Sequence, residues 1–333
     1  MLSSWYSQSV PDFKRENADV FASIPVTAIL PIKNGLNYVA RARHQLENTC
    51  RENDEILVID DNSIDGTEAV LEKWASEDHR VRVIKNSGEG LVSALNLGVK
   101  ESTNQWIARF DVDDTYNFER IHKQVSSIKH NVVAVFSDYK ILRPNGQSLG
   151  IIPSPVYSDA VAVSLISSRR TAHPSVIFSR EAVMSVGGYL PSDFPAEDLS
   201  LWLRLSRVGQ LVSIPEVLLN YELGLNSVSG QKRHLIQSVT SSLIRDVGIE
   251  AASLNSAYQR VDELMESYSH LNFGCERQIL FIQELSKALK ISGKSTMLGQ
   301  VKHLVKRIDI DLVRAGMNIS VGTFKRRAYR KRG

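Results

Sequence analysis

Three carboxylates fall within four positions of this chain, at Asp111, Asp113 and Asp114. They follow the apolar run 106–110, which is typical of the end of a buried strand, and alternation would put Asp111 and Asp113 on one side. Crowded carboxylates repel one another unless a cation lies among them, and Mg²⁺ accepts such ligands together with phosphate oxygens of a substrate. The stretch therefore predicts a metal site for a phosphorylated ligand. The alternative is a solvated acidic turn that caps a helix starting near Asn117.

The elements that would position these carboxylates form a repeating β-α pattern. Strands are expected at 26–30, 55–59, 81–84 and 106–110, and helices at 38–49, 68–76 and 91–100. Four units of roughly 25 residues predict an α/β fold with a doubly wound, mostly parallel sheet. The second strand also ends in acidic residues, Asp60 and Asp61, at the sheet edge where such folds bind ligands. Asp65 is expected to cap the helix that follows.

Several ligand classes are disfavoured by what the sequence lacks. The turn after the first strand has no Gly-x-Gly-x-x-Gly, and no Gly-x-x-x-x-Gly-Lys-Ser/Thr occurs, which argues against dinucleotide and P-loop sites.

No apolar run approaches the roughly 18–20 residues that cross a bilayer. The start shows no secretory signal pattern, and Cys50 and Cys275 fit no metal spacing, so we expect a cytoplasmic protein with reduced thiols.

Charge is unevenly distributed along the chain. Residues 301–333 hold ten Lys/Arg against two Asp, while the first 300 residues hold 30 basic and 35 acidic residues. Two aromatic residues are interleaved with six basic ones in the segment 324–332, which favours binding to the anionic cytoplasmic face of a membrane over a free tail. Nucleic acid is a poorer partner, because the body is acidic and shows no base-reading module.

The ordered motifs resemble the nucleotide-sugar half of family 2 glycosyltransferases, which have the GT-A fold. The resemblance rests on four segments in order, namely 26–31, 59–67, the helix with Gly90, Ala94, Asn96 and Gly98, and 111–114. It continues through Ala172–Arg180, the Gly187-Gly188-Tyr189 turn, Glu197-Asp198 at the start of a helix and a last strand at 214–221. It implies a GT-A domain over 24–229, divided into a nucleotide-sugar half (24–115) and an acceptor half (116–229). An N-terminal arm (1–23) and a helical C-terminal region with the basic tail (230–333) would flank it.

In the donor site, the resemblance gives Asp61 the role of accepting a hydrogen bond from the nucleotide base, with Pro31 and Lys33 lining the same pocket. An accepting carboxylate selects a base that offers an N–H, which favours uridine. The plainer role for Asp61 is to cap the turn with Ser63, and Lys33 could be an ordinary surface lysine.

At the metal motif, Asp113 would be the principal ligand of Mg²⁺ or Mn²⁺, and Asp111 would contact the ribose. The cation would bridge the diphosphate and neutralise the leaving group. Asp114 is expected instead to cap the helix that contains Arg120.

For the acceptor site, the resemblance makes Asp198 the general base of an inverting transfer, because one group must take the acceptor proton. Glu197 and His173 would line the acceptor site. The plainer alternatives are a capping pair for Glu197 and Asp198 and a structural role for His173. Trp202 is expected to belong to the core.

The function that the resemblance implies is transfer of a sugar from a nucleotide-diphosphate sugar, a UDP-sugar, to a glycan or lipid-linked saccharide of a surface polysaccharide. Two alternatives stay open, a nucleotidyltransferase-like enzyme and a non-catalytic module that binds sugar nucleotides or glycans. The loop 31–35 lacks the Gly-rich, Arg-containing character of nucleotidyltransferases. Leu95 stands where the family often has an arginine, so the diphosphate contact there is left open.

Overall fold

The structure is a computed structural model that describes residues 24–152, 154 and 171–223. The predicted N-terminal arm, the helical region 230–333, Cys275 and the basic tail lie outside the described residues, so the predictions made for them stay predictions. Within those residues, no helix has the length and apolar character needed to cross a membrane.

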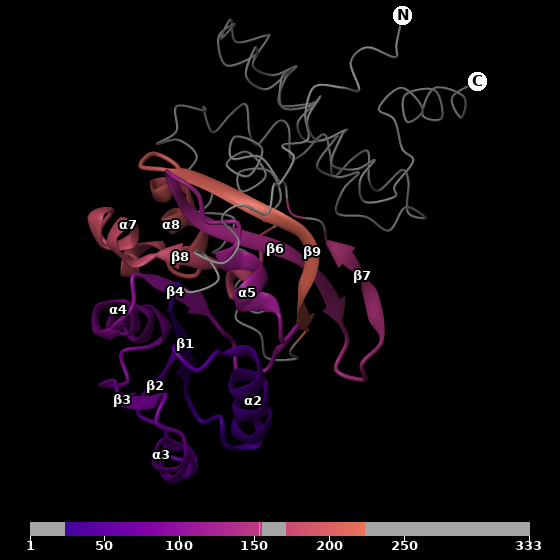
Figure 1. The fold of residues 1–333 in the computed structure, drawn as a ribbon. Helices are drawn as coiled ribbons and strands as arrows, with labels where there is room; N and C mark the ends of the chain where they lie inside the picture. Colours follow the sequence, from indigo (N-terminus) through magenta and orange to yellow (C-terminus); the bar gives the residue numbers. More distant parts are fainter. Residues whose placement is uncertain (1–23, 153, 155–170, 224–333) are drawn as a thin grey trace, which may run out of the picture.

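Strands and helices alternate through the first half of the domain, as predicted (Figure 1). The strands are β1 (Val26–Ile32), β2 (Glu55–Asp60), β3 (Val81–Lys85), β4 (Trp106–Arg109), β5 (Thr115–Tyr116), β6 (Val132–Leu142), β7 (Ser148–Ile152), β8 (Ile177–Ser179) and β9 (Gln210–Glu222). The helices are α2 (Leu36–Thr49), α3 (Thr67–Glu77), α4 (Leu91–Glu101), α5 (Arg120–Val125), α7 (Arg180–Ser185) and α8 (Glu197–Leu205), with 3₁₀ turns η2 (His173–Ser175) and η3 (Pro191–Asp193).

The sheet has two parts that differ in strand direction. Its order is β3-β2-β1-β4-β8-β6-β9-β5, and β7 pairs with β6 outside this path. The first four strands are parallel, β8 is antiparallel to both of its neighbours, and β6 and β9 are parallel. The predicted mostly parallel α/β sheet is confirmed, and its parallel strands bring the loops after β1, β2 and β4 to one edge.

The second half contains two strands longer than the sequence pattern indicated. The strand expected at 132–136 continues to Leu142 and turns back into β7, and the strand expected at 214–221 already starts at Gln210. Together β6 and β9 form the long band in the centre of Figure 1. Strand β9 also pairs with β5, which follows the carboxylate motif directly in the sequence. This end of the band therefore lies next to the motif.

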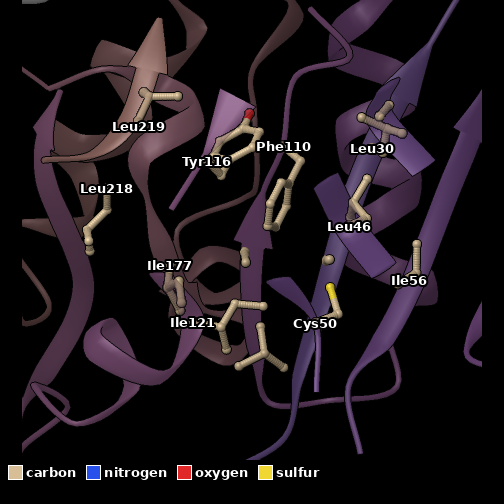
Figure 2. Packing of buried hydrophobic residues seen from close by; sticks show 14 of the residues in the cluster. Leu30, Leu46, Cys50, Ile56, Phe110, Tyr116, Ile121, Ile177, Leu218 and Leu219 are labelled. Atoms are coloured by element: carbon tan, nitrogen blue, oxygen red, sulfur yellow. The ribbon is translucent and has the colours of Figure 1, made fainter. Parts of the chain in front are cut away.

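One face of the sheet is covered by an apolar core beneath α2 and α5 (Figure 2). Leu46 and Cys50 from the α2 segment meet Phe110 and Ile121, all of them at most 5% exposed. Cys50 is a buried free thiol, as expected, and burial raises its pKa. Phe110 directly precedes Asp111 in the sequence, so its packing in the core fixes the point at which the carboxylate motif begins.

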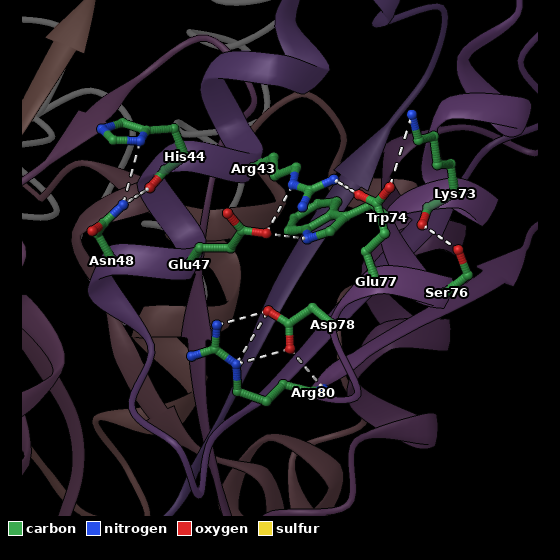
Figure 3. Close-up of polar contacts among 10 residues, drawn as sticks. All are labelled: Arg43, His44, Glu47, Asn48, Lys73, Trp74, Ser76, Glu77, Asp78 and Arg80. Carbon is green, nitrogen blue, oxygen red and sulfur yellow. Dashed lines mark hydrogen bonds and ion pairs between the residues drawn. The ribbon is translucent and has the colours of Figure 1, made fainter.

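Polar contacts fasten α2 to α3 on the same face (Figure 3). The Arg43 guanidinium lies 2.8 Å from Glu47 on its own helix and 2.5 Å from Glu77 on α3. The Trp74 side chain is buried, and its indole N–H is satisfied by a 3.1 Å hydrogen bond to Glu47. At the other end of α3, Asp65 accepts from the N–H groups of Thr67 and Leu36, so the predicted cap serves the starts of both helices.

Candidate active site

The first group of site residues surrounds Asp61, which lies directly after β2 and is 4% exposed. One carboxylate oxygen accepts from the Asn86 side chain at 2.6 Å and from the Gly90 N–H at 3.3 Å. The other lies 3.1 Å from the Lys33 ammonium. Lys33 and Asp61 are therefore brought together as a pair. The Ser63 hydroxyl donates to Asp60 rather than to Asp61, so capping with Ser63 is the wrong explanation for Asp61.

The strand ends explain how this group forms. β1 runs through Pro31 to Ile32, past the break expected at Pro31, and Pro31 pairs with Ile59 of β2. The carbonyl of Ile32 then accepts from the Asp61 N–H at 2.8 Å. Asp61 is thereby fixed beside the partly buried Pro31 at the edge of the parallel sheet.

The second group consists of Asp111, Asp113 and Asp114, whose carboxylate oxygens lie within 4.8 Å of one another. Strand alternation does not produce this arrangement, because β4 ends at Arg109 before the motif begins. The loop is held instead by one local contact and one long-range contact. The Tyr116 hydroxyl accepts from the Asp111 N–H at 2.7 Å, and Arg41 of α2 donates to the Asp113 carbonyl.

The expected role of Asp114 as a helix cap is wrong. Its Oδ1 accepts from the backbone N–H of Glu222 at 2.8 Å, which connects the motif to the end of β9. Helix α5 begins only at Arg120, and no side chain caps it. Glu222 itself pairs with Arg41 at 2.8 Å, so α2, β9 and the motif are held by one network.

The electrostatics of this group favour a bound cation. Burial, and then the charge of Asp111, raises the pKa of Asp113. Burial and the charges of Asp111 and Asp113 raise the pKa of Asp114 well above its usual value. The buried Oδ2 of Asp114 accepts no hydrogen bond from any residue that the structure describes. Three clustered oxygen ligands, one of them unsatisfied, suit Mg²⁺ or Mn²⁺.

The third group consists of the residues that the family resemblance assigns to the acceptor site. Helix α8 begins at Glu197, as predicted, with Glu197 buried and Asp198 partly exposed in its first turn. Trp202 is fully buried and packs edge to face on Phe136, with 5.2 Å between the ring centroids, which confirms it as a core residue.

His173 is part of a chain of hydrogen bonds that connects η2 to α4 through Tyr189. Its Nε2 lies 2.8 Å from the Tyr189 hydroxyl, and burial together with the Arg109 charge holds its pKa well below the usual value. The peptide groups of Tyr189 bond both ends of the Asn96 side chain on α4, each at 2.8 Å. His173 thus has a satisfied structural partner, and its contact with an acceptor stays a prediction.

Tyr189 also shows how near the second and third groups lie. Burial raises its pKa, and the charges of Asp198, Glu197 and Asp111 all act on its hydroxyl in the same direction. The Tyr189 hydroxyl is therefore within electrostatic range of both the carboxylate motif and the start of α8. The loop after β1 approaches the same motif, because Gly35 lies close to the side chain of Val112.

Known proteins resemble this chain in sequence and in fold. Residues 27–161 match the family model of Glycosyl transferase family 2. An uncharacterised glycosyltransferase of Rickettsia bellii is 27% identical over 194 residues, a match that covers 58% of this chain and only 28% of the Rickettsia protein. One from Haemophilus influenzae is 26% identical over 307 residues, covering 86% of this chain and 93% of that protein. The amylovoran biosynthesis glycosyltransferase AmsE of Erwinia amylovora is 28% identical over 182 residues, covering 54% and 68%.

Solved structures share the fold. The mannosyltransferase PcManGT of Pyrobaculum calidifontis, in complex with GDP-Man and Mn²⁺, aligns with a TM-score of 0.51 and 16% identity over 94% of this chain and 84% of that one. S. aureus TarS 1-349, in complex with UDP-GlcNAc, aligns with a TM-score of 0.55 and 14% identity over 89% and 93%. The described fold is that of a GT-A glycosyltransferase. Residues 27–161 thus carry the match to Glycosyl transferase family 2, and the curated relatives are glycosyltransferases by name.

Several residues around the site were not singled out from the sequence. Arg41 and Glu222 hold the motif through contacts with residues 72 and 108 positions away, which no local pattern marks. Tyr116 bonds Asp111 only five positions away, but the sequence does not show that its hydroxyl turns back to the motif. Arg109 could have been found from the sequence, because a charged residue inside an apolar strand requires a partner when it is buried.

Proposed function

We propose that this protein is a glycosyltransferase that transfers a sugar with inversion from a nucleotide-diphosphate sugar, most simply a UDP-sugar. The observation that carries the proposal is the placement of two acidic groups on one sheet edge. A buried Asp61 held by Asn86 and Lys33 lies on one side, and the three-carboxylate motif lies on the other. A nucleotide base at Asp61 would direct its diphosphate toward Asp113.

The carboxylate motif would hold the metal. Asp113 is proposed as the principal ligand of Mg²⁺ or Mn²⁺, since its carboxylate is partly exposed and lies beside the unsatisfied oxygen of Asp114. Asp111 would contact the ribose. When bound, the cation supplies positive charge that stabilises the departing diphosphate.

Asp198 is proposed as the general base. The acceptor hydroxyl oxygen forms a bond to the anomeric carbon, and the bond from that carbon to the diphosphate oxygen breaks. The hydroxyl proton moves to the Asp198 carboxylate, and the diphosphate leaves with the bonding electrons. The start of α8 favours a negative charge at this position, and Asp198 is partly exposed to an incoming sugar. Glu197 and His173 would line the acceptor.

The acceptor is proposed to be a glycan or lipid-linked saccharide of a surface polysaccharide. This follows from the relative AmsE, which belongs to surface polysaccharide biosynthesis. Binding to a membrane surface through the segment 324–332 belongs to the same proposal, because a lipid-linked acceptor would lie there.

The mechanism is tested by replacing Asp198 with asparagine. Wild-type protein, Asp198→Asn and the control Glu181→Gln, an exposed carboxylate in the first turn of α7, are incubated with UDP-hexoses, Mn²⁺ and saccharide acceptors. General base catalysis contributes about 10²–10⁴-fold, so release of UDP should fall by at least about 100-fold in Asp198→Asn only. Undiminished transfer by Asp198→Asn would contradict the assignment.

A further inference from the structure

Arg109 is a buried cation beside the carboxylate motif. It is the last residue of β4 and is 2% exposed. Its backbone is held on both sides, by pairing with Ile29 of β1 and by a 3.1 Å hydrogen bond to the Val176 carbonyl. A guanidinium keeps its charge at every accessible pH, so its position matters for any ion that binds nearby.

The charge of Arg109 is directed at the motif. One terminal nitrogen lies 2.5 Å from Asp111 Oδ1, while the Asp111 side chain keeps 29% exposure. Its Nε donates to no residue of the described part of the chain, although this atom is buried. The same positive charge also acts on Asp113 and Asp114, where it lowers the pKa against the effect of burial.

We propose that Arg109 is a positioning residue that holds Asp111 in an ion pair and opposes metal binding until the donor diphosphate arrives. This inference rests on the proposed metal and donor site. A divalent cation entering the motif would find one carboxylate already paired and a fixed positive charge next to it. The negative diphosphate of the donor offsets that charge, so cation and donor would be retained together.

The sign of this effect separates it from a purely structural role. If Arg109 only supported the loop, its loss would loosen Asp111 and weaken metal binding. If it acts as a counter-charge, its loss should strengthen metal binding in the absence of nucleotide. Unit charges about 4 Å apart interact substantially even at an effective dielectric constant of about 20, so a change of at least about tenfold is expected.

The test is a titration of Mn²⁺ against the full chain, with free Mn²⁺ measured by electron paramagnetic resonance, without and with UDP. Arg109→Met should bind Mn²⁺ at least about tenfold more tightly than wild type without UDP, and UDP should then improve that binding less than it does in wild type. Arg109→Lys keeps the charge and should restore an affinity close to wild type. Arg82→Met removes an arginine of β3 that pairs with Glu55 and should change nothing.

Removing one partner of a buried ion pair can prevent folding, so a second comparison uses Asp111→Asn alone and together with Arg109→Met. The double variant should bind Mn²⁺ about tenfold more tightly than Asp111→Asn. Equal or weaker binding after loss of Arg109, in either background, overturns the inference while leaving the donor site intact. Wild-type protein that binds neither Mn²⁺ nor UDP would overturn the proposed function, and this inference with it.

Discussion

The turn at Gly187-Gly188 offers a sharp test of how the segment that contains Tyr189 is attached to helix α4. Gly188 has φ +68, and a Cβ atom there would lie 2.6 Å from Oδ1 of Asn96. That oxygen accepts from the Tyr189 N–H, while the Asn96 amide donates to the Tyr189 carbonyl. Asn96 cannot move aside without losing these bonds, so Gly188→Ala should disturb the whole contact.

The magnitude follows from two contributions. A side chain in the left-handed region costs about 1–2 kcal/mol. Weakening two hydrogen bonds adds about 1–3 kcal/mol. Gly188→Ala should therefore reduce the free energy of unfolding by about 2–5 kcal/mol. Gly187 is a matched control, because it has φ +85 and no atom of the residues that the structure describes lies within 4 Å of its Cβ position, so Gly187→Ala should lose only about 1–2 kcal/mol.

The assay is urea denaturation of the full chain followed by circular dichroism. A third variant isolates the contact with Asn96. In an Asn96→Ala background, Gly188→Ala should cost no more than Gly187→Ala does in the wild type. Equal destabilisation by Gly187→Ala and Gly188→Ala in the wild-type background would refute the proposed role of Asn96.

Three further predictions concern separate parts of the chain. Asp54→Asn should lower the free energy of unfolding by about 2–3 kcal/mol in urea denaturation, because Asp54 is buried, accepts from the Val26 N–H at 2.8 Å and pairs with Arg51 at 2.7 Å; an unchanged midpoint would contradict this. The pKa of His173 is depressed in the folded state, so on acidification the unfolded chain takes up this proton first and the free energy of unfolding falls below about pH 6.5. His173→Gln should therefore lose less stability than wild type between about pH 7.5 and 5.5. Equal losses in the variant and the wild type would contradict this prediction. Deleting 324–333 should reduce sedimentation with anionic lipid vesicles at moderate salt, whereas equal sedimentation would remove the membrane prediction.

The fold was predictable because its first half consists of repeating local patterns. Each strand from β1 to β4 is a short apolar run, and each helix follows a turn, so the sequence locates the elements to within a few residues. The strand directions of the second half were not visible locally. That β8 lies between β4 and β6 depends on the packing of segments about 45–70 residues apart.

The site was predictable to the level of its motifs but not of its contacts. Asp61 and Asp113 follow strands whose carboxyl ends must share one edge, so their proximity follows from topology. Asp114 could not be assigned correctly, because its partner is the backbone of Glu222, more than 100 residues away. The roles of Arg41 and Tyr189 likewise depend on long-range packing.

The most direct test of the central claim is a thermal-shift measurement with nucleoside diphosphates, with and without Mn²⁺. A ligand at 100 times its dissociation constant stabilises the folded state by about 2.7 kcal/mol, which raises the apparent melting temperature. We predict a shift with UDP that requires Mn²⁺, disappears in Asp113→Ala and loses its preference for uridine in Asp61→Ala. No shift with any diphosphate in wild-type protein would contradict a functioning donor site.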